Sequence, residues 1–265
     1  MDLGLAGKVA LVAGGSAGIG LAIAADLVRE GAAVCICGRD AGRLESARAE
    51  LERLAIASGS AQAGELISAS QVDIRDNAVA AEWVQRAADA RGAVHIVVSN
   101  AAGPPAGPTD AFGLDAYRAA VELAMLSHVG LVQSALPLLK SAGWGRVLMI
   151  ASETVRQPIP AFALSNVVRP GLVGFAKTLV RELGPGGITV NVLAPGHTAT
   201  ASVTDAITGD TDAELRRMAA EAGISLGRFA LPEEVAAAAV FLLSERASFI
   251  TGTVQVVDGG RAVGV

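Results

Sequence analysis

Short, continuously apolar segments alternate along this chain with segments whose apolar residues recur at helical spacing. The apolar segments predict strands at residues 8–14, 32–38, 70–74, 94–100, 145–152, 187–196 and 252–260. The segments of helical spacing predict helices at 18–31, 43–57, 77–91, 114–140, 161–183 and 232–245. Strands that are apolar throughout are buried on both faces, which is typical of a parallel sheet covered by helices. The pattern predicts one α/β domain over residues 1–265, a Rossmann fold with a doubly wound, mostly parallel seven-stranded sheet.

Two segments rich in Pro, Gly, Ser, Thr and Asp interrupt this alternation, at 104–111 and 198–213. Each follows the carboxyl end of a predicted strand. Substrates of doubly wound sheets bind at that edge. We therefore expect both segments near the substrate, the second as a candidate lid.

Composition narrows the classes of partner. The 265 residues carry a net charge of −5, which argues against nucleic acid because phosphate binding needs a basic surface. No uncharged apolar run reaches the roughly 18–20 residues of a membrane span, and the first residues lack the basic segment of a signal peptide. We expect a cytoplasmic protein without a membrane partner. Cys35 and Cys37 lie two apart on a strand and are expected to be small core side chains, with no metal site.

A glycine-rich turn joins the first strand to the first helix. Gly14, Gly18 and Gly20 follow KVALVA and open the helix. Glycines permit a tight turn and close approach of a ligand, and the helix N-terminus offers free N–H groups and a positive dipole end to a pyrophosphate. This context of strand, turn and helix predicts dinucleotide binding.

The end of the second strand bears on which dinucleotide is bound. An acidic residue there would bond a ribose 2′-hydroxyl, whereas this strand ends in Gly38 and Arg39. Arginine pairs with a 2′-phosphate by charge and bidentate geometry, so NADP(H) is favoured, with NAD(H) as the alternative. A surface ion pair between Asp40 and Arg39 would argue against NADP(H), because it would occupy the arginine. Asp73, at the end of the third strand, is expected at the adenine edge.

The chain resembles the short-chain dehydrogenase/reductase family over nearly its whole length. The motifs are AGGSAGIG (13–20), VDI (72–74), SNAAG (99–103), GRVLMIAS (145–152), ITVNVLAPGHTAT (188–200), GRFALPEEVA (227–236) and ITG with VDGG (250–260). The resemblance implies an oxidoreductase of a small-molecule carbonyl or alcohol, in which helices 114–140 and 161–183 form a homo-oligomer, a tetramer or dimer. It also implies a set of cofactor residues: Gly14, Ser16, Gly18, Ile19, Gly20, Arg39, Asp73, Ile74, Asn100, Ala101, Pro195, Gly196, Thr198 and Thr200.

The family's catalytic Asn, Ser, Tyr and Lys carry over only in part. Ser152 matches the serine, and spacing from it places Ser165 at the tyrosine and Arg169 at the lysine. A rival alignment puts Phe162 and Asn166 there but breaks the spacing, and the helix asparagine falls near Ala124. The chain's one tyrosine, Tyr117, lies before the long central helix. Pro170 is expected to push Arg169 out of helical geometry.

Without the tyrosine, several chemistries remain open. Ser152, Ser165 and Arg169 are the candidate catalytic residues, with water supplying the proton; Glu153 or His197 could replace the acid, or hydride could add to a conjugated double bond. The first alternative function is a cofactor-binding protein without turnover, as a sensor or partner subunit. The second is a non-redox, lyase- or dehalogenase-like enzyme, since the related halohydrin dehalogenases use Ser, Tyr and Arg.

Overall fold

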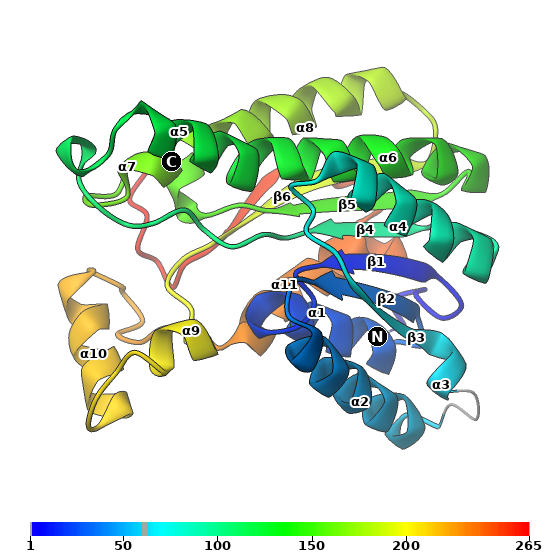
Figure 1. The fold of residues 1–265 in the computed structure, drawn as a ribbon, viewed down its shortest axis with the longest axis horizontal. Coiled ribbons are helices and arrows are strands. Elements are labelled where there is room, and N and C mark those ends of the chain that lie inside the picture. The colour runs from blue at the N-terminus through cyan, green and yellow to red at the C-terminus, as the bar shows by residue number, and fades with distance from the viewer. Residues whose placement is uncertain (1, 60–62, 265) are drawn as a thin grey trace.

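A computed structural model describes residues 2–59 and 63–264 (Figure 1). The strands are β1 (Val9–Ala13), β2 (Ala33–Gly38), β3 (Ile67–Gln71), β4 (Ile96–Ser99), β5 (Gly145–Ile150), β6 (Ile188–Pro195) and β7 (Val254–Val257). The α-helices are α1 (Gly18–Arg29), α2 (Ala41–Ala57), α3 (Ala63–Leu66), α4 (Asn77–Arg91), α5 (Leu114–Val121), α6 (Ser127–Ala142), α7 (Ala163–Val168), α8 (Pro170–Leu183), α9 (Ala201–Thr204), α10 (Thr211–Glu221) and α11 (Pro232–Leu243). Short turns of other helix types are η1 (Thr109–Ala111), η2 (Glu122–Leu126), η3 (Glu153–Val155) and η4 (Glu245–Ala247).

The strands form one seven-stranded sheet in the order β3-β2-β1-β4-β5-β6-β7. Every pairing is parallel, so all the strands present their carboxyl ends at one edge. The order reverses between β1 and β4, which is the point where doubly wound sheets bind their ligands. The predicted fold class is confirmed.

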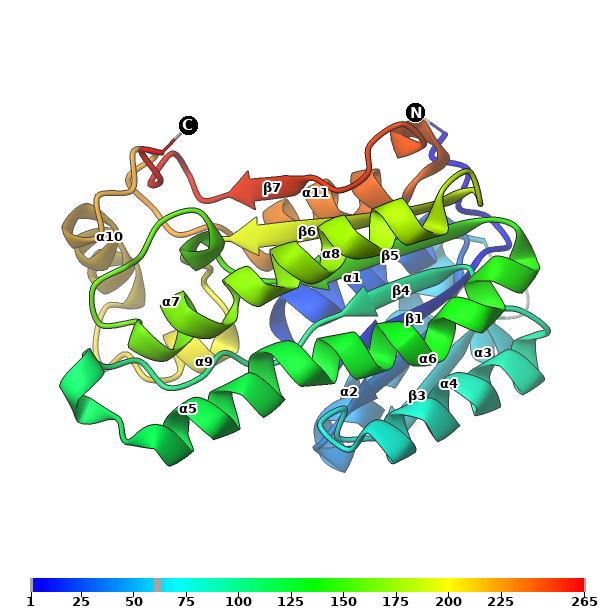
Figure 2. The ribbon, with the colours of Figure 1, turned by 90° about the horizontal axis from the view of Figure 1, so that it is seen from above.

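Helices cover both faces of the sheet (Figures 1 and 2). On one face α1, α2 and α11 pack against alternate strand residues such as Val12, Ile36 and Leu148. On the other, α4, α6 and α8 pack against the residues between them, including Leu11 and Val97. Cys35 and Cys37 are buried in this second layer as small core side chains, as predicted.

Three expectations about elements are corrected. The third strand begins at Ile67 rather than at 70, because Val34 pairs with Ile67 and the apolar Val72 already lies beyond the strand. The 198–213 segment is not all loop, since it holds α9 and the start of α10, whose Asp210 side chain accepts a hydrogen bond from the Ala213 N–H. Arg169 keeps helical angles (φ −66°, ψ −29°).

The helical angles of Arg169 have a simple cause. Its N–H still donates to the Ser165 carbonyl at 3.1 Å, and Pro170 stands at the first position of α8. A proline at that position removes no hydrogen bond that the helix needs. Arg169 therefore stays on the path where the resemblance places the lysine.

The helical run from Leu114 to Ala142 is long and apolar enough to cross a membrane by length and composition. Its Leu131, Val132, Ala135 and Leu139 are buried on the sheet. A helix that covers a protein core passes the same test, so the run is weak support for a membrane span.

Candidate functional site

The glycine turn after β1 is built for close approach to the start of α1. Gly14 and Gly18 have positive φ angles of 62° and 55°, which favour glycine. A side chain at Gly20 would overlap the Gly14 carbonyl, so the missing Cβ lets the helix sit against the turn. The first turn of α1 has neither a side-chain cap nor an acidic residue. Its N–H groups and positive dipole end are therefore free for a phosphate, and this turn fits a dinucleotide.

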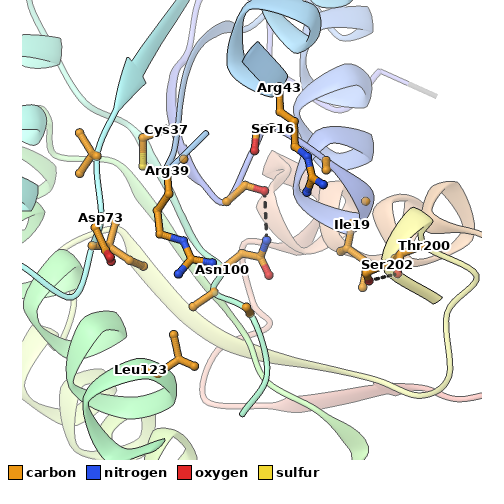
Figure 3. Close-up of a pocket in the computed structure, with 18 of the residues that line it drawn as sticks. Ser16, Ile19, Cys37, Arg39, Arg43, Asp73, Asn100, Leu123, Thr200 and Ser202 are labelled. Carbon is orange, nitrogen blue, oxygen red and sulfur yellow. Dashed lines mark hydrogen bonds between the residues drawn. The ribbon is translucent and has the colours of Figure 1, made fainter. Parts of the chain in front are cut away.

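A pocket of about 350 Å³ opens beside this turn, at the carboxyl ends of β1, β2 and β4 (Figure 3). Its lining contains ten of the predicted cofactor residues: Gly14, Ser16, Gly18, Ile19, Arg39, Asp73, Ile74, Asn100, Ala101 and Thr200. Gly20 is outside the lining and packs against the Gly14 carbonyl. The Asn100 amide reaches the Gly14 carbonyl at 3.4 Å and ties the ends of β1 and β4 together. The predicted residues from the N-terminal half thus converge on one concave surface.

The remaining predicted residues, Pro195, Gly196 and Thr198, lie outside the lining of this pocket. Gly196 packs on Asp258, where a Cβ would stand 2.8 Å from the Asp258 Cα. Thr198 is buried and its hydroxyl donates to the Gly196 carbonyl at 3.2 Å. These residues continue from β6 into the segment that leads to Thr200, so they connect the pocket to the end of the sheet that holds Ser152.

Basic residues concentrate at the β2 end of the pocket. Arg39 and Arg43 both line it (Figure 3), and Arg43 was not predicted. The Asp40 carboxylate caps α2 by accepting the Arg43 N–H at 2.8 Å, and no ion pair joins it to Arg39 in the described part of the chain. Asp73 pairs with Arg75, and the hydrogen bonds from Arg75 hold the pKa of Asp73 below its usual value. Two arginines four residues apart, in the turn after β2 and the first turn of α2, could have revealed this end of the pocket from the sequence.

The candidate catalytic residues surround the end of β5. Ser152 caps η3, and its Oγ accepts the Thr154 N–H at 3.3 Å. Ser165, from α7, is buried, and its hydroxyl shares a 3.0 Å hydrogen bond with that of Thr154. Arg169, also buried, donates from Nη1 to the Ile150 and Ala151 carbonyls. The structure therefore gathers the three residues around one turn, with Ser165 and Arg169 beneath it.

Burial lowers the pKa of Arg169 to about 10, so the guanidinium is still charged at neutral pH. The same region contains His128 of α6, whose Nδ1 lies 2.9 Å from the Ser99 hydroxyl. Burial, with the charge of Arg169 second, lowers the pKa of His128 to about 3. His128 is thus neutral, and its Nε2 has no hydrogen-bond partner in the described structure.

The rival pair from the sequence has other roles. Asn166 holds the preceding loop, with its amide bonded to both the N–H and the C=O of Ile159. Phe162 packs near the His197 ring. Ala124 is buried in the π-helical turn η2, and Tyr117 packs in a small apolar cluster with it.

Glu153 and His197, the substitute acids considered from the sequence, lie against each other. His197 Nδ1 is 3.3 Å from Glu153 Oε1. Arg261, which the sequence did not suggest, places Nη1 3.1 Å from Glu153 Oε2. Arg261 stands in the tail after β7, far from Glu153 along the chain, and no local pattern points to the contact.

Comparison with known proteins agrees with this geometry. The family model described as Enoyl-(Acyl carrier protein) reductase matches residues 13–262. The chain belongs to the short-chain dehydrogenase/reductase family. Within the family, it is 30% identical to 3-oxoacyl-[acyl-carrier-protein] reductase FabG of Chlamydia muridarum, over 97% of this chain and 98% of the relative.

Two solved structures of this family are similar throughout. L-sorbose reductase from Gluconobacter frateurii, complexed with NADPH and L-sorbose, has a TM-score of 0.89 at 30% identity and full coverage of both chains. A short chain oxidoreductase from Pseudomonas aeruginosa PAO1, bound to NADPH and described as containing an atypical catalytic center, has a TM-score of 0.91 at 27% identity. It covers 97% of this chain and 98% of its own.

Proposed function

We propose that this protein is an NADP(H)-dependent oxidoreductase that transfers hydride to or from a small-molecule carbonyl or alcohol without a tyrosine acid. The observation that carries the proposal is the pocket in which an uncapped helix start, a glycine turn and two arginines converge. The NADPH held by the sorbose reductase and the Pseudomonas oxidoreductase supports it.

Different residues of the pocket would bind different parts of the cofactor. The N–H groups at Gly18 and Ile19 would bind the pyrophosphate, and Asp73 would lie at the adenine edge, since all three line the pocket. Arg39 and Arg43 supply two positive charges for a 2′-phosphate, a group that NADPH has and NADH lacks. A bound nicotinamide supplies or accepts the hydride.

The turn after β5 would bind the substrate oxygen. Because Ser152 Oγ already accepts the Thr154 N–H, its own O–H remains available to donate to a carbonyl oxygen. The buried charge of Arg169 stabilises negative charge that develops on that oxygen, by an amount that grows with the exclusion of water. A phenol is not needed for either interaction.

The alternative of cofactor binding without turnover has one observation in its favour. Ser165, at the position that the resemblance gives to the tyrosine, is buried and bonded to Thr154. A serine hydroxyl is a much weaker acid than a phenol, so it is a poor proton donor. Measured turnover of a substrate distinguishes the two functions, because the cofactor-binding protein would bind NADPH without oxidising it.

The experiment combines cofactor specificity with a substrate screen. Arg39→Gln and Arg43→Gln should each weaken NADPH binding by about 10- to 100-fold, since a hydrogen bond to a charged group contributes about 1.5–3 kcal/mol. NADH binding should change little. Arg53→Gln, an exposed arginine of α2 outside the pocket, is the matched control.

NADPH oxidation is then followed with neutral ketones, aldehydes and conjugated carbonyl compounds. We expect turnover with at least one, reduced in Ser152→Ala. Binding of NADPH without any turnover would favour the sensor function instead.

A further inference from the structure

Three ionisable side chains at the edge of the sheet remain unassigned by the proposed function. Glu153 begins η3 just after β5, His197 comes two residues after β6, and Arg261 stands in the tail after β7. These strands are neighbours and run parallel, so their carboxyl ends meet at one edge. That edge also carries Ser152, the residue next to Glu153.

Glu153 lies between the two potential cations. The Glu153 side chain is only 3% exposed, with His197 3.3 Å from one carboxylate oxygen and Arg261 3.1 Å from the other. His197 Nδ1, Arg261 Nη1 and Glu153 Oε2 make these contacts without the alignment of a hydrogen bond. A buried carboxylate is costly unless it is paired. Glu153 therefore depends on both partners.

The His197 ring is fixed from several directions. Its backbone carbonyl accepts the Ala230 N–H at 3.0 Å. Phe162 and Phe229 stand edge-on to the imidazole, with ring centroids at 6.4 and 5.1 Å. The His197 side chain keeps 22% exposure, so protons from solvent can reach it. With Nδ1 toward Glu153, the second nitrogen, Nε2, is the one left for a ligand.

Arg261 is anchored as firmly as the histidine. Its Nε donates to the Ala222 carbonyl at 2.9 Å, just after α10. The tail around it is held by the Asp258 carboxylate, which accepts the N–H groups of Gly260 and Ala262. Arg261 thus reaches Glu153 from a rigid support.

We infer that His197 is the proton donor of the reduction, and that Glu153 and Arg261 are positioning residues that orient and balance its charge. The inference rests on the proposed function. With a bound nicotinamide supplying hydride to the carbonyl carbon, the proton would leave His197 Nε2 for the carbonyl oxygen. The imidazolium would become neutral imidazole and the carbonyl an alcohol, with the reduced dinucleotide as the reductant. Solvent then returns a proton to the exposed edge of the ring, and the reverse steps serve alcohol oxidation.

Other charges near His197 are already engaged. Arg228, beside Phe229, pairs with Glu234 at 2.6 Å, and Asp258 is bonded to the backbone. Phe162 and Phe229 add no charge. Glu153 is therefore the charged group that faces the His197 ring, and Arg261 faces Glu153.

The first test uses the protein without cofactor. The sequence has three histidines, so NMR can resolve each imidazole, with His197→Gln assigning the signal. In Glu153→Gln the ring signals of His197 should shift, because the carboxylate that faces Nδ1 is replaced by a neutral amide. In Arg261→Gln they should shift less, because Arg261 reaches Glu153 and not the ring. Ring signals of His197 that stay in place in Glu153→Gln would overturn the inference.

The second test measures turnover against pH. The donor acts in its protonated form, so kcat for reduction should fall along an alkaline limb as pH rises. His197→Gln should remove this limb and Glu153→Gln should alter it, which a merely structural role would not produce. His197→Gln should lower kcat by about 10²–10⁴-fold, the usual contribution of general acid catalysis, while NADPH binding persists.

His95→Gln is the matched control, because His95 lies at the opposite edge of the sheet, before β4. It should leave the limb unchanged. Wild-type protein that fails to bind NADPH contradicts the proposed function itself. Normal NADPH binding and turnover with an unimpaired His197→Gln variant contradicts the donor assignment alone.

Discussion

Replacement of Gly20 by alanine tests whether the glycine turn is as tight as the structure has it. A Cβ there would overlap the Gly14 carbonyl oxygen, lying 2.7 Å from its carbon and 2.8 Å from Asn100 Nδ2. Non-bonded carbons are comfortable at about 3.5–4.0 Å, so α1 must move by about 1 Å. Overpacking of this kind costs about 1–3 kcal/mol. In a domain of this size each kcal/mol lowers Tm by roughly 2–4 °C.

The displacement also moves the helix start away from the pocket. We therefore expect Gly20→Ala to weaken NADPH binding at least about tenfold, equivalent to 1.4 kcal/mol. Gly174, exposed in the middle of α8, is the control, since a Cβ there meets nothing within 4 Å. Gly174→Ala should raise Tm, because alanine is favoured over glycine by about 0.5–1 kcal/mol in a helix. Calorimetric melting of both variants measures Tm, and calorimetric titration measures their affinity for NADPH. A Gly20→Ala protein with unchanged Tm and NADPH affinity would contradict the close packing of Gly20 on the Gly14 carbonyl.

Three further predictions concern buried titratable groups. Because burial depresses the pKa of His128 from 6.5 to about 3 in the folded protein, the unfolded chain binds the proton first as pH falls below 6.5. The proton uptake of His128 should then lower the free energy of unfolding by about 1.4 kcal/mol for each pH unit between 6.5 and 3. His128→Gln should reduce this dependence on pH, as measured by denaturant melts at pH 7 and 5. Burial raises the pKa of Cys37 to about 12. Iodoacetamide at pH 8 should therefore label neither Cys37 nor the buried Cys35 until the protein is denatured, as measured by mass spectrometry. Rapid labelling of the folded protein would contradict the burial of these thiols. Arg169→Gln leaves the Ile150 and Ala151 carbonyls short of a donor, and should cost about 1–3 kcal/mol in a melt and reduce kcat with little effect on the NADPH Kd.

Local sequence was sufficient wherever neighbours along the chain decide the structure. The glycine turn could be predicted because Gly14, Gly18 and Gly20 stand between an apolar strand and a helical pattern. The central strands were found because they are apolar on both faces. The edge strand β3 was misplaced, since ISASQ has few apolar residues and the VDI beyond it is more apolar. Helix α10 was partly missed because few of its residues are buried.

The catalytic region was harder to predict because tertiary contacts decide it. Nothing in the sequence around Arg261 shows that it meets Glu153, because the contact requires β5, β6 and β7 to be placed side by side. Pro170 shows the limit of a local preference. Proline disfavours helical angles in the residue before it, but Pro170 stands at the first position of α8 and Arg169 stays helical. The effect of a proline can be predicted only when its position in the helix is known.

Calorimetric titration of the purified protein with NADPH and, separately, NADH would show whether the pocket beside the glycine turn binds NADP(H). The two arginines and the uncapped start of α1 predict saturable binding of NADPH, tighter than that of NADH. Equal affinity for both would contradict the assignment of Arg39 and Arg43 to a 2′-phosphate. Binding of neither nucleotide would contradict the proposed oxidoreductase function.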